Sequence, residues 1–277
     1  MTDQELKLKS IQYRKKILRY ITEAGAGHTG GSLSCVDILN VLYNRVMNVS
    51  PANFQFGGRD RYIQSKGHSV EALYVVLADC GFFPESELET LCRYQSPFVG
   101  HPTRKVPGIE MNTGALGHGL PICVGLAIAG KLDAVPKRVF TLLGDGEMAE
   151  GSNWEAAMAA AHYKLNNLTA ILDHNTLQIT GHTRDVCSNE PLDEKFTAFG
   201  WDVRTVDGHD FAKLTEALTA KQDGKPTIII ANTVKGRGVS FMENVVSWHH
   251  GVPSAEQYEL AQSELAAAEQ ALVSEAR

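Results

Sequence analysis

Apolar residues along this chain occur in two kinds of pattern. Three short runs, at 138–143, 168–172 and 226–232, are almost continuously apolar and contain many β-branched residues. Such runs predict parallel strands that are buried on both faces, because every side chain then meets a core. Residues 60–65 and 201–206 are also strand-like, the second with alternating apolar and polar positions.

The segments between these runs have helical patterns. Residues 4–24 form an amphipathic pattern with apolar positions among Lys, Arg and Gln. A second helix is expected to start at Ser34 as its N-cap, with Asp37 in the capping box, and to continue to Val46. The polar stretch 176–187 is expected to be a loop. Further helices are expected at 72–78, from 84, and at 120–131, 152–164, 192–199, 210–220 and 255–276.

Strands alternate with helices over residues 138–232. This order predicts an α/β fold with a parallel β-sheet, right-handed crossovers and helices on both faces. A chain of 277 residues can bury one substantial core. We find no internal repeat and no low-complexity linker. We therefore expect a single domain over 1–277, with a core at about 10–253 and a C-terminal helical tail at 254–277.

Composition and charge exclude several classes of function. No apolar run approaches the ~20 residues that cross a bilayer, and the N-terminus lacks the layout of a signal peptide, so we expect a cytoplasmic protein without a membrane partner. The formal charge of −6 and the pI near 5.9 argue against nucleic acid as a partner. The five cysteines are widely spaced without a Cys-x-x-Cys pair, which indicates reduced thiols.

The predicted strand at 138–143 ends in Gly144-Asp145-Gly146, and the strand at 168–172 is followed by Asn175. Gly-Asp-Gly alone is weak evidence, because tight turns contain these residues for conformational reasons. Two adjacent parallel strands, however, bring a carboxylate and a carboxamide to one edge of the sheet. Oxygen ligands beside a helix N-terminus suit a small hard cation such as Mg²⁺ together with phosphate.

Histidine is concentrated beside glycine. A single histidine of this kind is usually an ordinary surface residue, but several of these fall at predicted strand ends, where α/β proteins bind ligands. A dedicated zinc site is not expected, because His-x-x-x-His and His-Glu-x-x-His spacings do not occur. The histidines next to glycine are His28, His68, His101, His118, His182, His209 and His250; the motif-free His182 and His209 are expected at the surface.

Taken together, the motifs resemble transketolase in type and order. The resemblance runs from His28 to about Pro253 and implies a thiamine-diphosphate-binding fold. The matching segments are Gly27-His28-Thr29-Gly30, Lys66-Gly67-His68, Gly100-His101-Pro102, Thr113-Gly114-Ala115-Leu116-Gly117, Gly144-Asp145-Gly146 with Glu150-Gly151, Asn175, Lys235-Gly236-Arg237-Gly238 and Trp248-His249-His250-Gly251.

The resemblance implies a cofactor site for thiamine diphosphate. Asp145, Asn175 and the Leu177 carbonyl would bind Mg²⁺, for which Ca²⁺ or Mn²⁺ could substitute. The residues implied to contact the cofactor itself are His68, Gly114, Leu116, Gly146, Glu147, Asn175, Lys235 and His250.

The resemblance also assigns catalytic positions. His28 and His101 would contact the donor ketose and move protons during cleavage between C2 and C3. A further histidine is either His249 or His250: alignment on Lys235 and Trp248 selects His249, whereas alignment on Gly251 selects His250. Glu150 stands where the family has an acidic residue at a contact between subunits.

The pyrimidine-binding domain of the family has no counterpart after Pro253. The resemblance therefore implies the N-terminal subunit of a split transketolase, which would transfer a two-carbon ketol unit from a ketose phosphate to an aldose. Its expected partner is a C-terminal subunit with the pyrimidine-binding domain, in an α₂β₂ heterotetramer.

Two alternatives stay open. The chain could be a subunit of another thiamine-diphosphate enzyme, of the deoxyxylulose-phosphate synthase or 2-oxoacid dehydrogenase type, or a catalytically inactive regulatory protein. The His101 and His249-His250 motifs favour transketolase over the first alternative, and the intact set of His28, His68 and His101 argues against the second.

Overall fold

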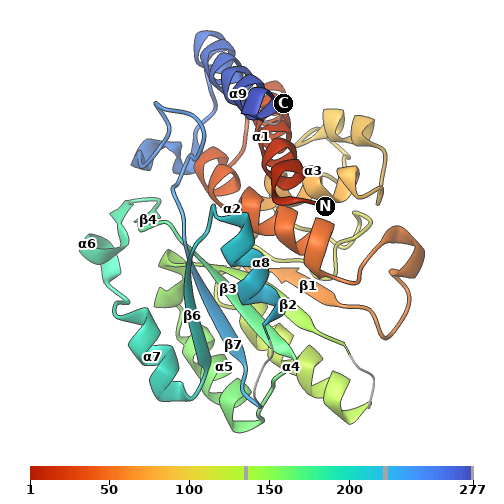
Figure 1. The fold of residues 1–277 in the computed structure, drawn as a ribbon, viewed down its shortest axis with the longest axis vertical. Helices are drawn as coiled ribbons and strands as arrows, with labels where there is room; N and C mark the ends of the chain where they lie inside the picture. The colour runs from red at the N-terminus through yellow and green to blue at the C-terminus, as the bar shows by residue number, and fades with distance from the viewer. Residues whose placement is uncertain (134–136, 221–223, 276–277) are drawn as a thin grey trace.

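A five-stranded parallel sheet forms the centre of the protein (Figure 1). The computed structural model describes residues 1–133, 137–220 and 224–275. The strand order across the sheet is β1-β2-β3-β7-β6, and every neighbouring pair is parallel. The predicted α/β class is therefore confirmed. The strands are β1 (Arg61–Gln64), β2 (Val139–Gly144), β3 (Leu168–His174), β6 (Asp202–Asp207) and β7 (Thr227–Asn232).

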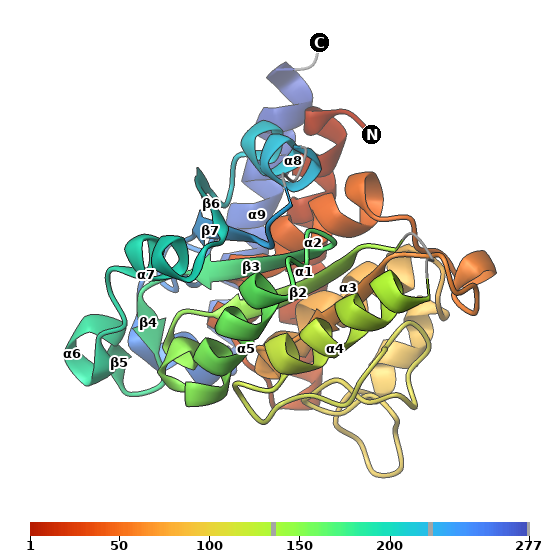
Figure 2. The same ribbon diagram turned by 90° about the horizontal axis from the view of Figure 1, so that it is seen from below.

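Helices cover both faces of the sheet, as predicted (Figure 2). Successive side chains of the central strands enter different cores: Ile229 packs toward α1, α2 and α3, whereas Ile228 and Ile230 pack toward α4 and α5. This alternation explains why these strands are continuously apolar. One face carries α1 (Asp3–Ala24), α2 (Thr29–Val41), α3 (Val70–Asp79) and α8 (Phe211–Thr219), and the other carries α4 (Gly119–Leu132), α5 (Gly151–His162) and α7 (Leu192–Phe199).

The start of α2 differs from the prediction. The helix begins at Thr29, five residues before the predicted N-cap Ser34. Three glycines and a histidine at 27–31 suggested a loop, but the glycines serve close packing: a Cβ atom at Gly30 would lie 2.8 Å from the Trp248 carbonyl oxygen. The Ser34 hydroxyl caps nothing and instead bonds Asp173 Oδ2 at 2.7 Å.

Two other local predictions were wrong. The stretch 176–187 is not a plain loop, because it contains the hairpin β4 (Leu177–Gln178) and β5 (Gly181–His182) and the short helix α6 (Thr183–Cys187). His209 is not a surface residue: its side chain is 11% exposed and its Nδ1 lies 2.7 Å from Asp37 Oδ2. The contact of His209 joins residues 172 positions apart, whereas the hairpin forms by local pairing of Leu177 with His182 and of Gln178 with Gly181.

The C-terminal segment forms α9 (Ala255–Glu275), which lies beside α1 (Figure 1). Gln262 Nε2 donates to the Lys15 carbonyl at 3.0 Å, and Lys15 also pairs with Glu269. Within the ranges that the structure describes, no helix is both long enough and apolar enough to pass through a membrane.

Candidate active site

The register of the sheet brings the two predicted oxygen ligands together. β2 and β3 are neighbours, with Gly144 opposite Asp173, so the residues that follow them meet at one edge of the sheet, as predicted. Asp145 and Asn175 are both buried. Thr176 has a φ of +63°, which is unusual for a β-branched residue, and this turn leads the chain from Asn175 to Leu177.

Each of these oxygens has a partner from the chain itself. Asp145 accepts hydrogen bonds from the backbone N–H groups of Gly146, at 2.8 Å, and Thr176. Asn175 Oδ1 accepts the Leu177 N–H at 3.2 Å. Burial raises the pKa of Asp145, with the charge of Asp173 acting in the same direction.

A cavity of about 290 Å³ opens at this edge of the sheet. Predicted site residues form most of its wall: His28, His68, Gly114, Leu116, Asp145, Gly146, Glu147, Asn175, Leu177, Lys235 and His249. His101, His250 and Glu150 do not line it, although the first two lie beside its histidines. Four lining residues had not been predicted as site residues: Lys66, Gly144, Gln178 and Ile179.

Two of the lining residues each have a buried polar side-chain atom that makes no hydrogen bond in the described part of the chain. These atoms are His28 Nδ1 and Gln178 Oε1. A buried polar atom that makes no hydrogen bond is costly, so a polar group that a ligand brought to either residue would relieve that cost. Gln178 was missed because its place in the β4–β5 hairpin was not predicted.

The imidazole of His28 is at the centre of a histidine cluster. Its ring centroid lies 4.5 Å from that of His250, 5.2 Å from His68, 5.7 Å from His249 and 5.9 Å from His101. Burial and, to a smaller extent, the charge of the neighbouring His250 lower the pKa of His28 to about 4. Burial also lowers the pKa of His68 and of His101. Because these pKa values lie below the ordinary value of about 6.5, the three imidazoles are neutral at pH 7.

Lys235 connects this cluster to the oxygen ligands. Its ammonium group donates to the Leu177 carbonyl at 2.9 Å and lies 2.8 Å from His249 Nδ1. Burial, together with the charge of Lys66, lowers the pKa of Lys235 to about 8. Of the two histidines that the sequence left unresolved, His249 is the one in the cavity wall, whereas His250 is exposed and contacts His28 edge to face.

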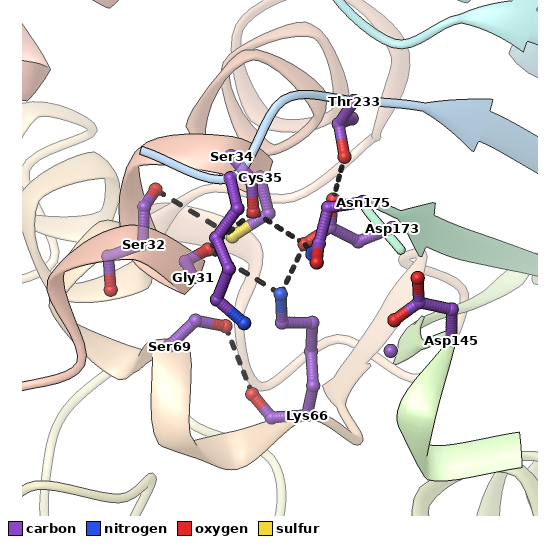
Figure 3. A network of polar contacts seen from close by, with 12 residues as sticks. Gly31, Ser32, Ser34, Cys35, Lys66, Ser69, Asp145, Asp173, Asn175 and Thr233 are labelled. Carbon is purple, nitrogen blue, oxygen red and sulfur yellow. Dashed lines mark hydrogen bonds and ion pairs between the residues drawn. The ribbon is translucent and has the colours of Figure 1, made fainter. Parts of the chain in front are cut away.

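A buried network of polar side chains adjoins the cavity, and Asp173 is at its centre (Figure 3). Its carboxylate pairs with the Lys66 ammonium group and accepts the Asn175 amide at 3.1 Å. It also accepts the hydroxyls of Ser34, at 2.7 Å, and Thr233. Asp173 therefore connects its own segment to three that are distant in sequence, those of Ser34, Lys66 and Thr233. In the sequence the only signal for Asp173 was a charged residue directly after the apolar run 168–172.

Glu147 and Gly114 shape the wall of the cavity. The buried Glu147 carboxylate accepts the backbone N–H groups of Gly117, at 2.9 Å, and Gly144, at 3.0 Å, so it connects the loop before α4 to the end of β2. Gly114 has a φ of +139°, and a Cβ atom there would lie 2.6 Å from His101 Cδ2. Only glycine allows this approach. The exposed Glu150 lies outside the cavity, at the N-cap of α5.

Comparison with known proteins identifies the family. The family described as transketolase, thiamine diphosphate binding domain, matches residues 10–272. The chain belongs to the transketolase family. The family, the enzyme class and the thiamine-diphosphate-binding fold inferred from the motifs are thus confirmed.

The chain is similar to transketolase subunits and to one part of a solved transketolase. An apulose-4-phosphate transketolase subunit of Phocaeicola vulgatus is 47% identical over 267 residues, covering 96% of this chain and 95% of that protein. The 6-deoxy-6-sulfo-D-fructose transketolase subunit SqwG of a Clostridium species is 40% identical, covering 96% and 98%. The transketolase of Campylobacter jejuni superposes with a TM-score of 0.83 at 28% identity, covering 99% of this chain but only 48% of that one. The chain thus spans about half of this solved transketolase.

Proposed function

We propose that this chain is the diphosphate-binding N-terminal subunit of a split transketolase. With a C-terminal subunit that carries the pyrimidine-binding domain, it would transfer a two-carbon ketol unit from a ketose phosphate to an aldose. The observation that carries the proposal is that one cavity is lined both by the oxygen ligands after β2 and β3 and by three imidazoles of the histidine cluster, those of His28, His68 and His249. Coverage of two relatives named as subunits over nearly their full length supports the division into two chains.

The donor set of the cavity fits a magnesium ion. It combines the Asp145 carboxylate with two neutral oxygens, those of the Asn175 amide and the Leu177 carbonyl, which is the chemistry that Mg²⁺ prefers. The Leu177 carbonyl already accepts a cationic donor, the Lys235 ammonium group. Among the described residues no three His, Cys, Asp or Glu side chains lie together as a metal cluster. Ca²⁺ or Mn²⁺ would fit the same ligands.

The other lining residues fit the anionic end of thiamine diphosphate. Lys66 and Lys235 would balance the diphosphate charge, the Gly146 N–H and His68 would donate to its oxygens, and Leu116 would contact the ring system. When bound, the cofactor would supply the carbon nucleophile and the electron sink for cleaving the ketose between C2 and C3.

The histidines would handle the substrate. His28 and His101 would hydrogen-bond the ketose hydroxyls, with His249 or His250 as a third contact. Their lowered pKa values favour the neutral imidazole, which has a free ring nitrogen to accept a hydroxyl proton during the reaction. Glu150, exposed beside this site, would contact a neighbouring chain of the assembly.

The proposal extends to organisation. We propose one diphosphate-binding domain over 1–277 with a helical tail, which would assemble with its partner as a cytoplasmic α₂β₂ heterotetramer. An interface that replaces a covalent domain junction should be obligate and bury more than about 2,000 Å².

Reconstitution tests the function. The tagged chain is purified alone and with the co-purifying polypeptide, and ketose phosphate cleavage is measured with thiamine diphosphate and Mg²⁺. We expect turnover only from the two chains together. Turnover by the isolated chain would contradict the half-enzyme proposal, and cofactor binding without turnover by the complex would favour the regulatory alternative.

A further inference from the structure

Helix α3 starts just after the loop that carries His68, and its buried Glu71 reaches the start of α2. Glu71 Oε1 accepts the backbone N–H of His28 at 3.2 Å, and Oε2 accepts the Ser32 hydroxyl at 2.8 Å. The approach is close: a Cβ atom at Gly27 would lie 2.9 Å from Glu71 Oε1. The carboxyl group thus fixes the backbone at the residue before α2.

One turn further along the same helix, Tyr74 reaches a different loop. Its hydroxyl lies 3.1 Å from the carbonyl oxygen of His101 and 3.0 Å from that of Val99. The Tyr74 side chain is buried, at 1% exposed. Residues three apart on a helix share one face, so a single face of α3 contacts the backbone at both His28 and His101.

Glu71 is energetically costly at a buried position that an apolar side chain could fill. It is 2% exposed, and none of the ion pairs found in residues 1–133, 137–220 and 224–275 includes it. Its two donors are neutral, and burial raises its pKa to about 7. The titratable side chains that its charge acts on are Tyr74 and Cys92, and burial raises the pKa of both, so neither offsets its charge. A buried carboxyl without a cation costs stability, which points to a role in the site.

The His28 ring depends on this backbone contact. Its Nδ1 is buried and has no hydrogen-bond partner in the described residues. The ring is therefore oriented by its own backbone and by packing against the other imidazoles. A shift of the His28 backbone would change its distance to His101, whose ring centroid is 5.9 Å away.

We propose that α3 positions both histidines, with Glu71 and Tyr74 as positioning residues that set the separation of the His28 and His101 imidazoles. The proposal rests on the function proposed above, in which both histidines contact the ketose. Neither Glu71 nor Tyr74 lines the cavity. Both act through the backbone of another residue.

The chemistry of Glu71 allows a conservative variant. In Glu71→Gln the amide oxygen can accept the His28 N–H, while the amide nitrogen donates to Ser32 Oγ, as the neutral acid would. In Glu71→Ala both contacts are lost. Tyr74→Phe removes only the hydroxyl that contacts His101. Because a misplacement of about 1 Å can cost about a hundredfold in rate, we expect Glu71→Ala and Tyr74→Phe to lower kcat by about tenfold to a hundredfold.

The experiment measures kcat, KM for the ketose and cofactor affinity on the two-chain enzyme, together with the histidine ring NMR signals of the isolated chain. Glu71→Ala and Tyr74→Phe should lower kcat, keep cofactor affinity, and shift the signals of His28 and His101 respectively. Glu71→Gln should keep most of the wild-type kcat, and any change of kcat with pH near 7 should disappear in this variant.

Tyr13→Phe is the matched control, because its hydroxyl bonds Asp79 at the far end of the same helix, at 2.6 Å. It should lose thermal stability to a similar extent as Tyr74→Phe without changing kcat or the ring signals. Unchanged ring signals in Tyr74→Phe and Glu71→Ala would overturn the proposal even if the reconstituted enzyme proved inactive. An inactive wild-type complex with shifted signals in the variants would instead refute only the proposed function.

Discussion

The buried pair of Lys66 and Asp173 gives the sharpest test of how this site is held together. Asp173 is 0% exposed and Lys66 is 1% exposed. Replacing Asp173 by Asn keeps the shape but leaves the ammonium group buried without its counter-charge. Removing one partner of a buried ion pair typically costs about 3–5 kcal/mol.

The hydrogen-bond count supports that magnitude. The Asp173 carboxylate accepts from Lys66, Ser34, Asn175 and Thr233. An asparagine offers one oxygen, so it can serve only about half of these donors, and each buried donor left unpaired costs about 1–3 kcal/mol. We expect Asp173→Asn to lower the free energy of unfolding by about 4 kcal/mol, a large part of the roughly 5–15 kcal/mol of an ordinary domain.

The free energy of unfolding is measured by urea denaturation of four chains: wild type, Asp173→Asn, Lys66→Met and the double variant. The double variant should recover much of the loss, because it removes the uncompensated charge. Glu23→Gln is the control, since it breaks the exposed pair of Glu23 with Arg19, which is worth at most about 1 kcal/mol. A cost below about 1 kcal/mol for Asp173→Asn, or strictly additive single effects, would refute this reasoning.

Four further changes have defined outcomes. Asp145→Ala should abolish the Mg²⁺-dependent binding of thiamine diphosphate while circular dichroism stays native; undiminished affinity in calorimetry would refute the metal assignment. His101→Ala should lower kcat by about 10²–10⁴-fold, and full activity at saturating donor would exclude its proton-transfer role. Gly114→Ala should lower kcat, because the added Cβ atom displaces His101; a variant that kept the kinetics of the wild type would contradict this. Because burial raises the pKa of Glu71 from 4.5 to about 7, the contribution of Glu71 to the free energy of unfolding should fall by about 3 kcal/mol as pH rises from 4.5 to 7; in urea titrations Glu71→Gln should gain that amount relative to wild type over this range, and a constant difference between the two would refute it.

The sequence by itself determined the features that depend on neighbouring residues. The apolar runs at 138–143, 168–172 and 226–232 predicted strands buried on both faces, and the sheet contains β2, β3 and β7 there. Because parallel neighbours end at the same edge, the placement of Asp145 beside Asn175 also followed from the strands alone. Ordered motifs then identified the family and most residues of the cavity wall.

Tertiary structure decided the features that depend on distant parts of the chain. The start of α2 at Thr29 depends on glycine packing against the Trp248 backbone. Asp173 gathers partners up to 139 residues away, and Glu71 bonds a residue 43 positions before it. No periodicity records such pairs, because a buried charge or a hydrogen-bonded backbone group is stabilised by whichever atoms packing brings to it, and those atoms are fixed only when the sheet and its helices have assembled.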